Sequence, residues 1–124
     1  MMNAIESFQN SIDNLMASSA DIKAVAVISS DGLMLHSNIK DINPDKVAAL
    51  SAAVLGLAKK SASEMNFGML NEVQIKGEDS TYIILSAGAR KVLTLIVSTN
   101  CNIGMINLLA RDAAKQLSEQ GELV

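Results

Sequence analysis

His36, Cys101 and Asp31 are the residues whose types could support nucleophilic chemistry in this chain. Such a site needs a nucleophile, a base and an orienting carboxylate in hydrogen-bonded order, together with donors for an oxyanion. The chain has one histidine and one cysteine, and their spacing does not tie them together. We therefore predict a surface or hydrogen-bonded His36, no catalytic residues and no enzyme activity. A redox role for Cys101 is the weaker interpretation, because no basic residue stands near it in the sequence.

Patterns that hold a nucleotide, a metal ion or a cofactor are missing from the sequence. Neither Gly-x-x-x-x-Gly-Lys nor Gly-x-Gly-x-x-Gly occurs, and one cysteine cannot form an internal disulfide or a multi-cysteine metal site. The net charge is −3, basic residues occur at most in pairs, and aromatic residues make up 2% of the chain. Nucleic-acid binding usually needs a basic surface and stacking platforms. We expect no cofactor, no metal and no nucleic-acid partner.

The start of the chain, Met1–Glu6, lacks the basic residues and continuous apolar run of a signal peptide. No segment approaches the roughly 18 apolar residues that a membrane span requires. A single cysteine is also typical of a reducing compartment. These features predict a cytoplasmic protein that does not insert into a membrane.

The segment Asn43–Gly68 is the most informative element of the chain. Asn43 suits a helix N-cap, Pro44 suits the first helical position, and Gly68 suits the left-handed residue after the helix end. We predict a helix from Pro44 to about Asn66, roughly 33 Å long. The stripe expected to face a sheet consists of Val47, Leu50, Val54, Leu57, Ala58 and Ser61.

The other side of this helix is apolar as well, where an ordinary surface helix carries charges. It consists of Ala48, Ala49, Ala52, Ala53, Leu55 and Gly56. Helices that are apolar all round are normally buried, so a contact with a second copy or a partner is the favoured interpretation. Burial within the same chain, or an Ala-rich helix chosen for its propensity, are the alternatives.

We predict that two copies meet through this helix and the strand that follows it, at Ala49, Leu50, Ala53, Val54, Gly56, Leu57, Leu70, Asn71, Glu72, Val73, Gln74 and Ile75. A second set could bind another partner: Ala52, Leu55, Lys59, Lys60 and Ser63. The two lysines are either solvated or meet acidic groups of that partner. Methionines could fill the aliphatic core or form an adaptable binding surface; they are Met34, Met65, Met69 and Met105.

The remaining periodicity predicts a helix over 3–18, strands over 22–30 and 33–37 joined by an Asp31-Gly32 two-residue hairpin, and a half-exposed edge strand over 70–76. Strands over 81–87 and 91–98 and a helix from Ile103 to near Gly121 follow. The order α-β-β-α-β-β-β-α indicates one α+β domain spanning residues 1–124. We expect a five-stranded antiparallel sheet with the long middle helix on one face and the two terminal helices on the other, the 91–98 strand lying centrally.

The sequence resembles the Roadblock / dynein light chain superfamily in its prokaryotic, MglB-like branch. The resemblance covers nearly the whole chain and rests on fold-determining positions. They are the hairpin 24–35, the helix segments 47–50 and 55–58, the turn 76–79, and Asn102-Ile103-Gly104 with Leu109 and Arg111. It implies a profilin-like fold, and a homodimer or heterodimer built by the middle helix and third strand. It also implies a non-enzymatic partner or scaffold of Ras-like small GTPases.

Two functions from different classes follow from these observations. The first is a dimeric platform that binds and regulates or scaffolds a Ras-like small GTPase. The alternative is a monomeric profilin-like or PAS-like sensor that binds a small ligand between sheet and helix. An aliphatic core offers few polar groups to orient such a ligand, so the sensor ranks second.

Overall fold

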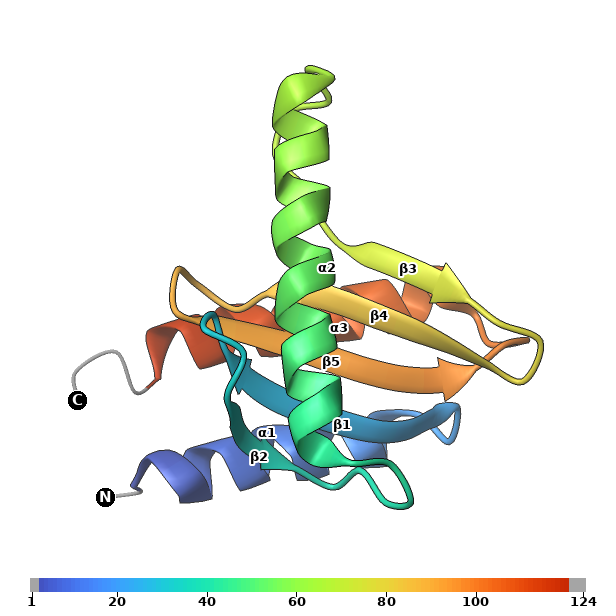
Figure 1. Ribbon diagram of the computed structural model, residues 1–124. Helices are drawn as coiled ribbons and strands as arrows, with labels where there is room; N and C mark the ends of the chain where they lie inside the picture. Colours follow the sequence, from blue (N-terminus) through green and yellow to red (C-terminus); the bar gives the residue numbers. More distant parts are fainter. Residues whose placement is uncertain (1–2, 121–124) are drawn as a thin grey trace.

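The computed structural model describes residues 3–120, so Met1, Met2 and the predicted helix end at Gly121 lie outside the described residues. Within the described residues, three helices lie around one sheet. Figure 1 shows this arrangement. The helices are α1 (Ala4–Ser18), α2 (Pro44–Glu64) and α3 (Ile103–Glu119). The strands are β1 (Ile22–Ser29), β2 (Met34–Ser37), β3 (Val73–Lys76), β4 (Ser80–Ser86) and β5 (Lys91–Ser98). The element order matches the prediction.

The five strands form one antiparallel sheet in the order β2-β1-β5-β4-β3. As predicted, β5 occupies the centre and is buried along most of its length. The strands β2 and β3 lie at the two edges, and each has only four residues. Short edge strands limit unwanted pairing, yet both still present unpaired backbone groups on their outer side.

Alternation along the strands divides the core between the two faces of the sheet. One cluster contains Val25, Leu93 and Leu95 and is closed by residues of α1 and α3 such as Ile12 and Ile106. The other cluster lies under α2 and contains Ala26, Ile28, Ile84 and Val92 with Val47, Ala48 and Leu55. The predicted layering, with α2 on one face and the terminal helices on the other, is confirmed (Figure 1).

The helix α2 begins as predicted, since the Asn43 side chain accepts a hydrogen bond of 2.9 Å from the Asp45 backbone N–H and Pro44 follows the cap. Its end comes two residues earlier than predicted. Asn66, with φ of 60°, takes the left-handed position that we assigned to Gly68. The Phe67 N–H then bonds the Ala62 carbonyl at 2.9 Å and the Asn66 N–H bonds the Ser63 carbonyl at 3.3 Å, which is a Schellman motif.

The hairpin between β1 and β2 also differs from the predicted two-residue turn. The Ser29 N–H bonds the Leu33 carbonyl at 2.8 Å, and the Gly32 N–H bonds the Ser29 carbonyl at 3.0 Å. Three residues therefore form the loop, and Gly32 takes its left-handed position with φ of 89°. The extra residue brings Gly32 against α2, where a Cβ would meet the Ala49 Cα and the Ala52 Cβ at 3.6 Å.

Candidate interaction surface

The buried side of α2 matches the stripe predicted from the sequence only in part, at Val47 and at the partly buried Val54. Val47, Ala48, Ser51, Leu55 and Ala62 face inward. Leu50 and Leu57, predicted to face the sheet, are 56% and 68% exposed. The correction has a physical cause, because α2 is apolar on several sides and hydrophobic periodicity could not choose among them. Small residues beneath the helix let its backbone approach the strands, while the two leucines project to one flank.

A cluster of hydroxyl groups fixes this rotation of α2. The Thr94 hydroxyl donates to the Ser51 Oγ at 3.1 Å, and the Ser51 Oγ is also hydrogen-bonded to the Tyr82 hydroxyl. Burial raises the pKa of Tyr82, and the hydrogen bonds to Ser51 and Thr94 partly oppose that shift. Ser51 must face the sheet for these groups to be satisfied, since buried hydroxyls without partners are costly.

The exposed part of α2 has two flanks of different character. An α-helix turns about 100° per residue, which places Leu50, Val54 and Leu57 on one flank and the small residues Ala49, Ala52 and Gly56 on the other. We call these the leucine flank and the small-residue flank. Gly32 of the β1–β2 loop lies so near α2 that a Cβ added to it would contact Ala49 and Ala52, so the small-residue flank faces that loop. On the leucine flank, Val54 packs against the core cluster under α2, as do Val73 and Tyr82.

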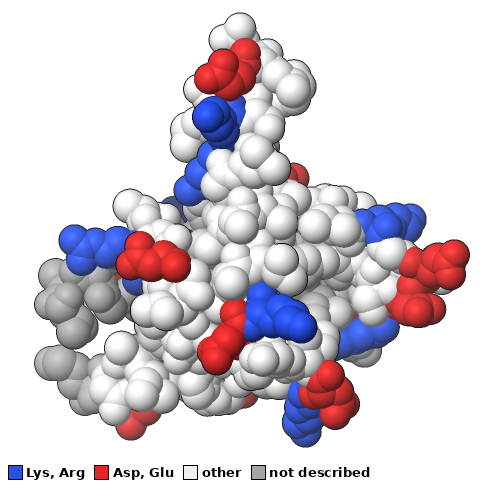
Figure 2. Space-filling view, in the orientation of Figure 1, with Lys and Arg blue, Asp and Glu red and all other residues white. Residues whose placement is uncertain are grey.

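The C-terminal part of α2 extends past the sheet edge formed by β3 (Figure 1). The turn that follows, Met65–Met69, is here called the tip. Phe67 is 74% and Met69 is 93% exposed, and Met65 is exposed as well. Of the two interpretations offered for the methionines, core filling therefore fails for Met65, Met69 and the exposed Met105, while Met34 packs against the core under α2. Figure 2 shows Lys and acidic side chains on this projection among uncharged atoms.

The edge strand β3 begins at Val73, whereas the sequence predicted a strand from Leu70. Leu70 instead packs against the cluster under α2, because the chain descends from the tip before it joins the sheet. Glu72 forms an ion pair with Arg111 of α3, with 2.6 Å between Oε1 and Nη2. Gln74 and Ile75 are exposed, as an edge strand available for pairing requires.

In the second predicted set of partner-binding residues, one residue is buried and the others are at least partly exposed. Leu55 is only 3% exposed and packs toward the sheet, so its prediction as a partner-binding residue is wrong. Ala52 is half-buried beside the β1–β2 loop, and Lys59, Lys60 and Ser63 are exposed on the projecting part of α2. Four of the five residues therefore remain accessible to a partner.

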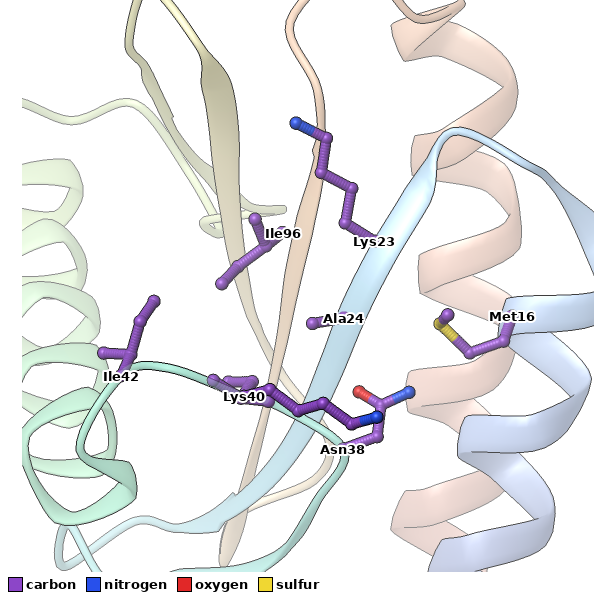
Figure 3. Close-up of a pocket in the computed structure, with 8 residues that line it drawn as sticks. Met16, Lys23, Ala24, Asn38, Lys40, Ile42 and Ile96 are labelled. Atoms are coloured by element: carbon purple, nitrogen blue, oxygen red, sulfur yellow. The ribbon is translucent and has the colours of Figure 1, made fainter.

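A pocket of about 420 Å³ opens on the sheet near the start of α2 (Figure 3). Its apolar walls include Ile42, from the loop before α2, and Ile96, from β5, whose side chains are shown in Figure 3. Lys23, Lys40 and Asn38 supply its polar groups. Sequence reasoning missed this pocket, although the isoleucines in the loop over 38–43 were a usable signal.

The residues that could have supported nucleophilic chemistry are not brought together. The His36 ring is hydrogen-bonded to the Gln9 side chain and lies on the edge strand β2. Cys101 lies at the opposite side of the sheet, in a small pocket with Gln74 and Lys76 of β3. Among residues 3–120, no three His, Cys, Asp or Glu side chains gather in a group able to hold a metal ion.

A family model described as the Roadblock/LC7 domain matches residues 8–97 of the sequence. The chain belongs to the Roadblock/LC7 family. One relative of this Roadblock/LC7 chain is the uncharacterized protein MJ1340 of Methanocaldococcus jannaschii. It is 28% identical over 97 residues, which cover 77% of this chain and 84% of that protein.

Solved structures share the fold of this Roadblock/LC7 chain at low sequence identity. The gliding protein MglB of Thermus thermophilus superposes with a TM-score of 0.86 at 17% identity, covering 100% of this chain and 95% of that one. Profilin II of Acanthamoeba castellanii gives a TM-score of 0.62 at 18% identity, covering 92% and 98%. The resemblance to an MglB-like, profilin-like fold is confirmed. Within residues 3–120, no helix of this Roadblock/LC7 chain is both long and apolar enough to cross a bilayer.

Proposed function

We propose that this protein is a non-enzymatic dimeric platform that binds and regulates or scaffolds a Ras-like small GTPase. One observation carries the proposal: Leu50 and Leu57 of the leucine flank are exposed, and Val54 of that flank packs against the same core cluster as Val73, the first residue of the edge strand β3. Exposed apolar surface of this kind marks an interaction site on soluble proteins. Membership of the Roadblock/LC7 family adds the expectation of a GTPase partner, a resemblance already carried by the sequence.

A second copy satisfies both exposed features in a single two-fold contact. Antiparallel pairing of β3 with its copy would join two sheets into one of ten strands and use the unpaired backbone groups of that edge. The two α2 helices would then lie antiparallel, each with its leucine flank toward the other. A heterodimer with a related Roadblock chain would use the same surfaces.

The small-residue flank remains exposed in such a dimer and is the surface that we assign to the GTPase. The exposed residues Ala49 and Gly56 permit a close approach of another backbone, next to the half-buried Ala52 beside the β1–β2 loop. Lys59 and Lys60 lie further along the same helix. Binding would regulate the GTPase if the platform held the switch loops of one nucleotide state more tightly than those of the other. No covalent step by this chain is required.

Light scattering across a dilution series tests the dimer. We expect a mass of about twice 13.1 kDa that falls only at high dilution. Leu57→Asp should raise the dissociation constant more than about 100-fold, because two-fold symmetry removes two leucine contacts worth roughly 1.5–3 kcal/mol each. The matched control is Leu108→Asp, which changes an exposed leucine of α3 on the other side of the sheet and should leave the mass unchanged. A wild-type protein that is monomeric at all concentrations would contradict the homodimer.

The pocket beside Ile42 and Ile96 supports a second candidate, a monomeric sensor of a small ligand. Its volume lies within the range of about 300–1,000 Å³ typical of ligand sites. Native mass spectrometry of the freshly purified protein distinguishes the two functions. A monomer carrying a stoichiometric small molecule would favour the sensor, and a ligand-free dimer would favour the platform.

A further inference from the structure

We infer that the tip of α2 from one copy occupies the pocket between Ile42 and Ile96 of a second copy. The inference rests on the proposed dimer and names a contact that a β3-to-β3 dimer would add at each end of the paired helices. It assigns an occupant to the pocket and a role to the exposed apolar residues Met65, Phe67 and Met69.

The tip is a preformed structure with an apolar end. The Schellman hydrogen bonds from Phe67 to Ala62 and from Asn66 to Ser63 fix its backbone, so little ordering is needed when it binds. Large apolar side chains at the end of a projecting helix gain nothing from their own sheet. Burial of Phe67 and Met69 against a second copy would remove that apolar area from water.

The length of α2 brings the tip to the required place. The helix has 21 residues and is therefore about 31 Å long, whereas the outer strands of a five-stranded sheet lie roughly 19 Å apart. For a helix that starts over the β2 edge, about 12 Å thus extends beyond the β3 edge. Figure 1 shows this projection. A two-fold axis at that edge lays this projection over the second copy. About 5 Å of this length spans the gap between the two paired β3 strands, so roughly 7 Å remains, which carries the helix end past β4 of the second copy. The residues of the tip, Met65–Met69, continue from there toward β5.

The pocket lies on β5 and on the correct side of α2. Ile96 of β5 and Ile42 of the loop before α2 form facing apolar walls (Figure 3). Ala24 lies on β1 next to Ile96, and its neighbours Ala26 and Ile28 pack under α2, so the pocket opens on the face that carries α2. That face, on the leucine flank, is where the second helix would lie.

Charge also matches between the tip and the pocket. Glu64 is the last residue of α2, exposed beside the tip, and Lys40 is exposed on the wall of the pocket. The other lysine, Lys23, already donates to the Ser80 Oγ at 2.9 Å and to the Asp79 carbonyl at 3.2 Å. Lys40 is therefore the cation that we pair with Glu64 of the second copy.

Cross-linking between differently labelled copies tests the contact. In a Cys101→Ser background, a Phe67→Cys protein is mixed with an Ile42→Cys protein and treated with a short bismaleimide at low concentration. We expect a covalent species of about twice 13.1 kDa. Phe67→Cys mixed with Met105→Cys is the control and should give none, because Met105 is exposed on α3 behind the sheet.

A dimer by light scattering that gives no more cross-link with Ile42→Cys than with Met105→Cys would overturn the inference and leave the proposed function standing. A monomer at every concentration would overturn the inference together with the homodimer on which it rests. Charge reversal supplies a second measurement: Glu64→Lys or Lys40→Glu alone should weaken the dimer about three- to tenfold, and the double variant should recover to within about twofold. Failure of the double variant to recover would remove the assigned ion pair.

Discussion

Tyr82 links the long helix to the sheet through a side chain that the sequence did not single out for this role. Its hydroxyl meets Ser51, 31 positions earlier in the chain, and Ser51 also accepts from Thr94, 43 positions later. Tyr82 packs against the aliphatic core cluster under α2, which contains Ala48, Leu55 and Ile84. Hydroxyls in such a site specify one rotation of α2, because other rotations would leave them without partners.

Removal of the Tyr82 hydroxyl should therefore cost stability without disturbing packing. Tyr82→Phe is expected to lower the free energy of unfolding by about 0.5–1.5 kcal/mol, measured by urea denaturation at one fixed protein concentration. Ser63→Ala on the exposed side of α2 is the control and should change it by less than about 0.5 kcal/mol. Equal stability of Tyr82→Phe and wild type would show that the hydroxyl cluster does not anchor the helix.

The raised pKa of Tyr82 predicts that the folded protein loses stability at high pH. Burial raises the pKa of Tyr82 above 10.0, so the folded protein holds the phenolic proton more tightly than the unfolded chain does. The resulting stabilisation is complete below the unfolded pKa and is lost as pH rises through the folded pKa. The stability advantage of wild type over Tyr82→Phe should thus shrink above about pH 10. Because Tyr82 is the only tyrosine, tyrosinate absorbance can report its titration directly.

At the scale of elements, the end of α2 decides where the tip points. Asn66 supplies the left-handed residue of the Schellman motif, and the chain then turns back through Leu70 into β3. A helix continued to Asn66 and stopped by Gly68, as the sequence predicted, would carry the apolar side chains in another direction. The choice between the two stops depends on where β3 must begin, which is a tertiary constraint.

Two substitutions at Asn66 test whether stability depends on the left-handed backbone conformation of this residue or on its amide side chain. Asn66→Gly is expected to keep stability within about 0.5 kcal/mol, since glycine adopts positive φ without strain. Asn66→Val should cost about 1–2 kcal/mol, because a β-branched residue strains in that region. Both are measured by thermal unfolding in the Leu57→Asp background, where association does not contribute. Equal effects of the two substitutions would argue against the left-handed conformation.

At the scale of the whole molecule, we propose that the leucine flank of α2 binds a second copy and that the small-residue flank binds a GTPase. The sequence placed Ala49, Ala53 and Gly56 in the dimer interface together with Leu50 and Leu57. A turn of about 100° per residue places Ala49 and Gly56 around the helix from Leu50 and Leu57, on the side toward the β1–β2 loop, which favours the small-residue flank as the GTPase surface. This division can be tested with one residue.

Gly56→Arg should block GTPase capture and leave the dimer intact. A Cβ at Gly56 meets no atom within 4 Å, so the fold accommodates the change. Capture of purified Ras-like GTPases, loaded with GDP or a non-hydrolysable GTP analogue, would be compared for wild type and variant, with the mass checked by light scattering. Gly104→Arg, in the first turn of α3, is the matched control. Separation of the protomers by Gly56→Arg would place this flank in the dimer interface instead.

Local signals in the sequence determined most of the fold. The caps Asn3, Asn43 and Asn102 mark the three helix starts, and the alternation and apolar runs gave the strands, the central place of β5 and the edge place of β3. The surplus of apolar residues on Pro44–Glu64 also predicted a second cover for this helix, which the proposed dimer would supply. These features depend on residues within a few positions of one another, so they are readable without coordinates.

Only the tertiary structure decided which face of α2 is buried, how far it projects, and where the pocket lies. A helical period cannot show which face is buried when several faces are apolar. The buried face is instead set by the hydrogen bonds of Ser51 with Tyr82 and Thr94, which are distant from it in sequence. The projection depends on the width of the sheet that α2 crosses, and the pocket depends on Ile42 meeting Ile96 across the fold. Such long-range juxtapositions are set by packing of the whole chain rather than by local propensity.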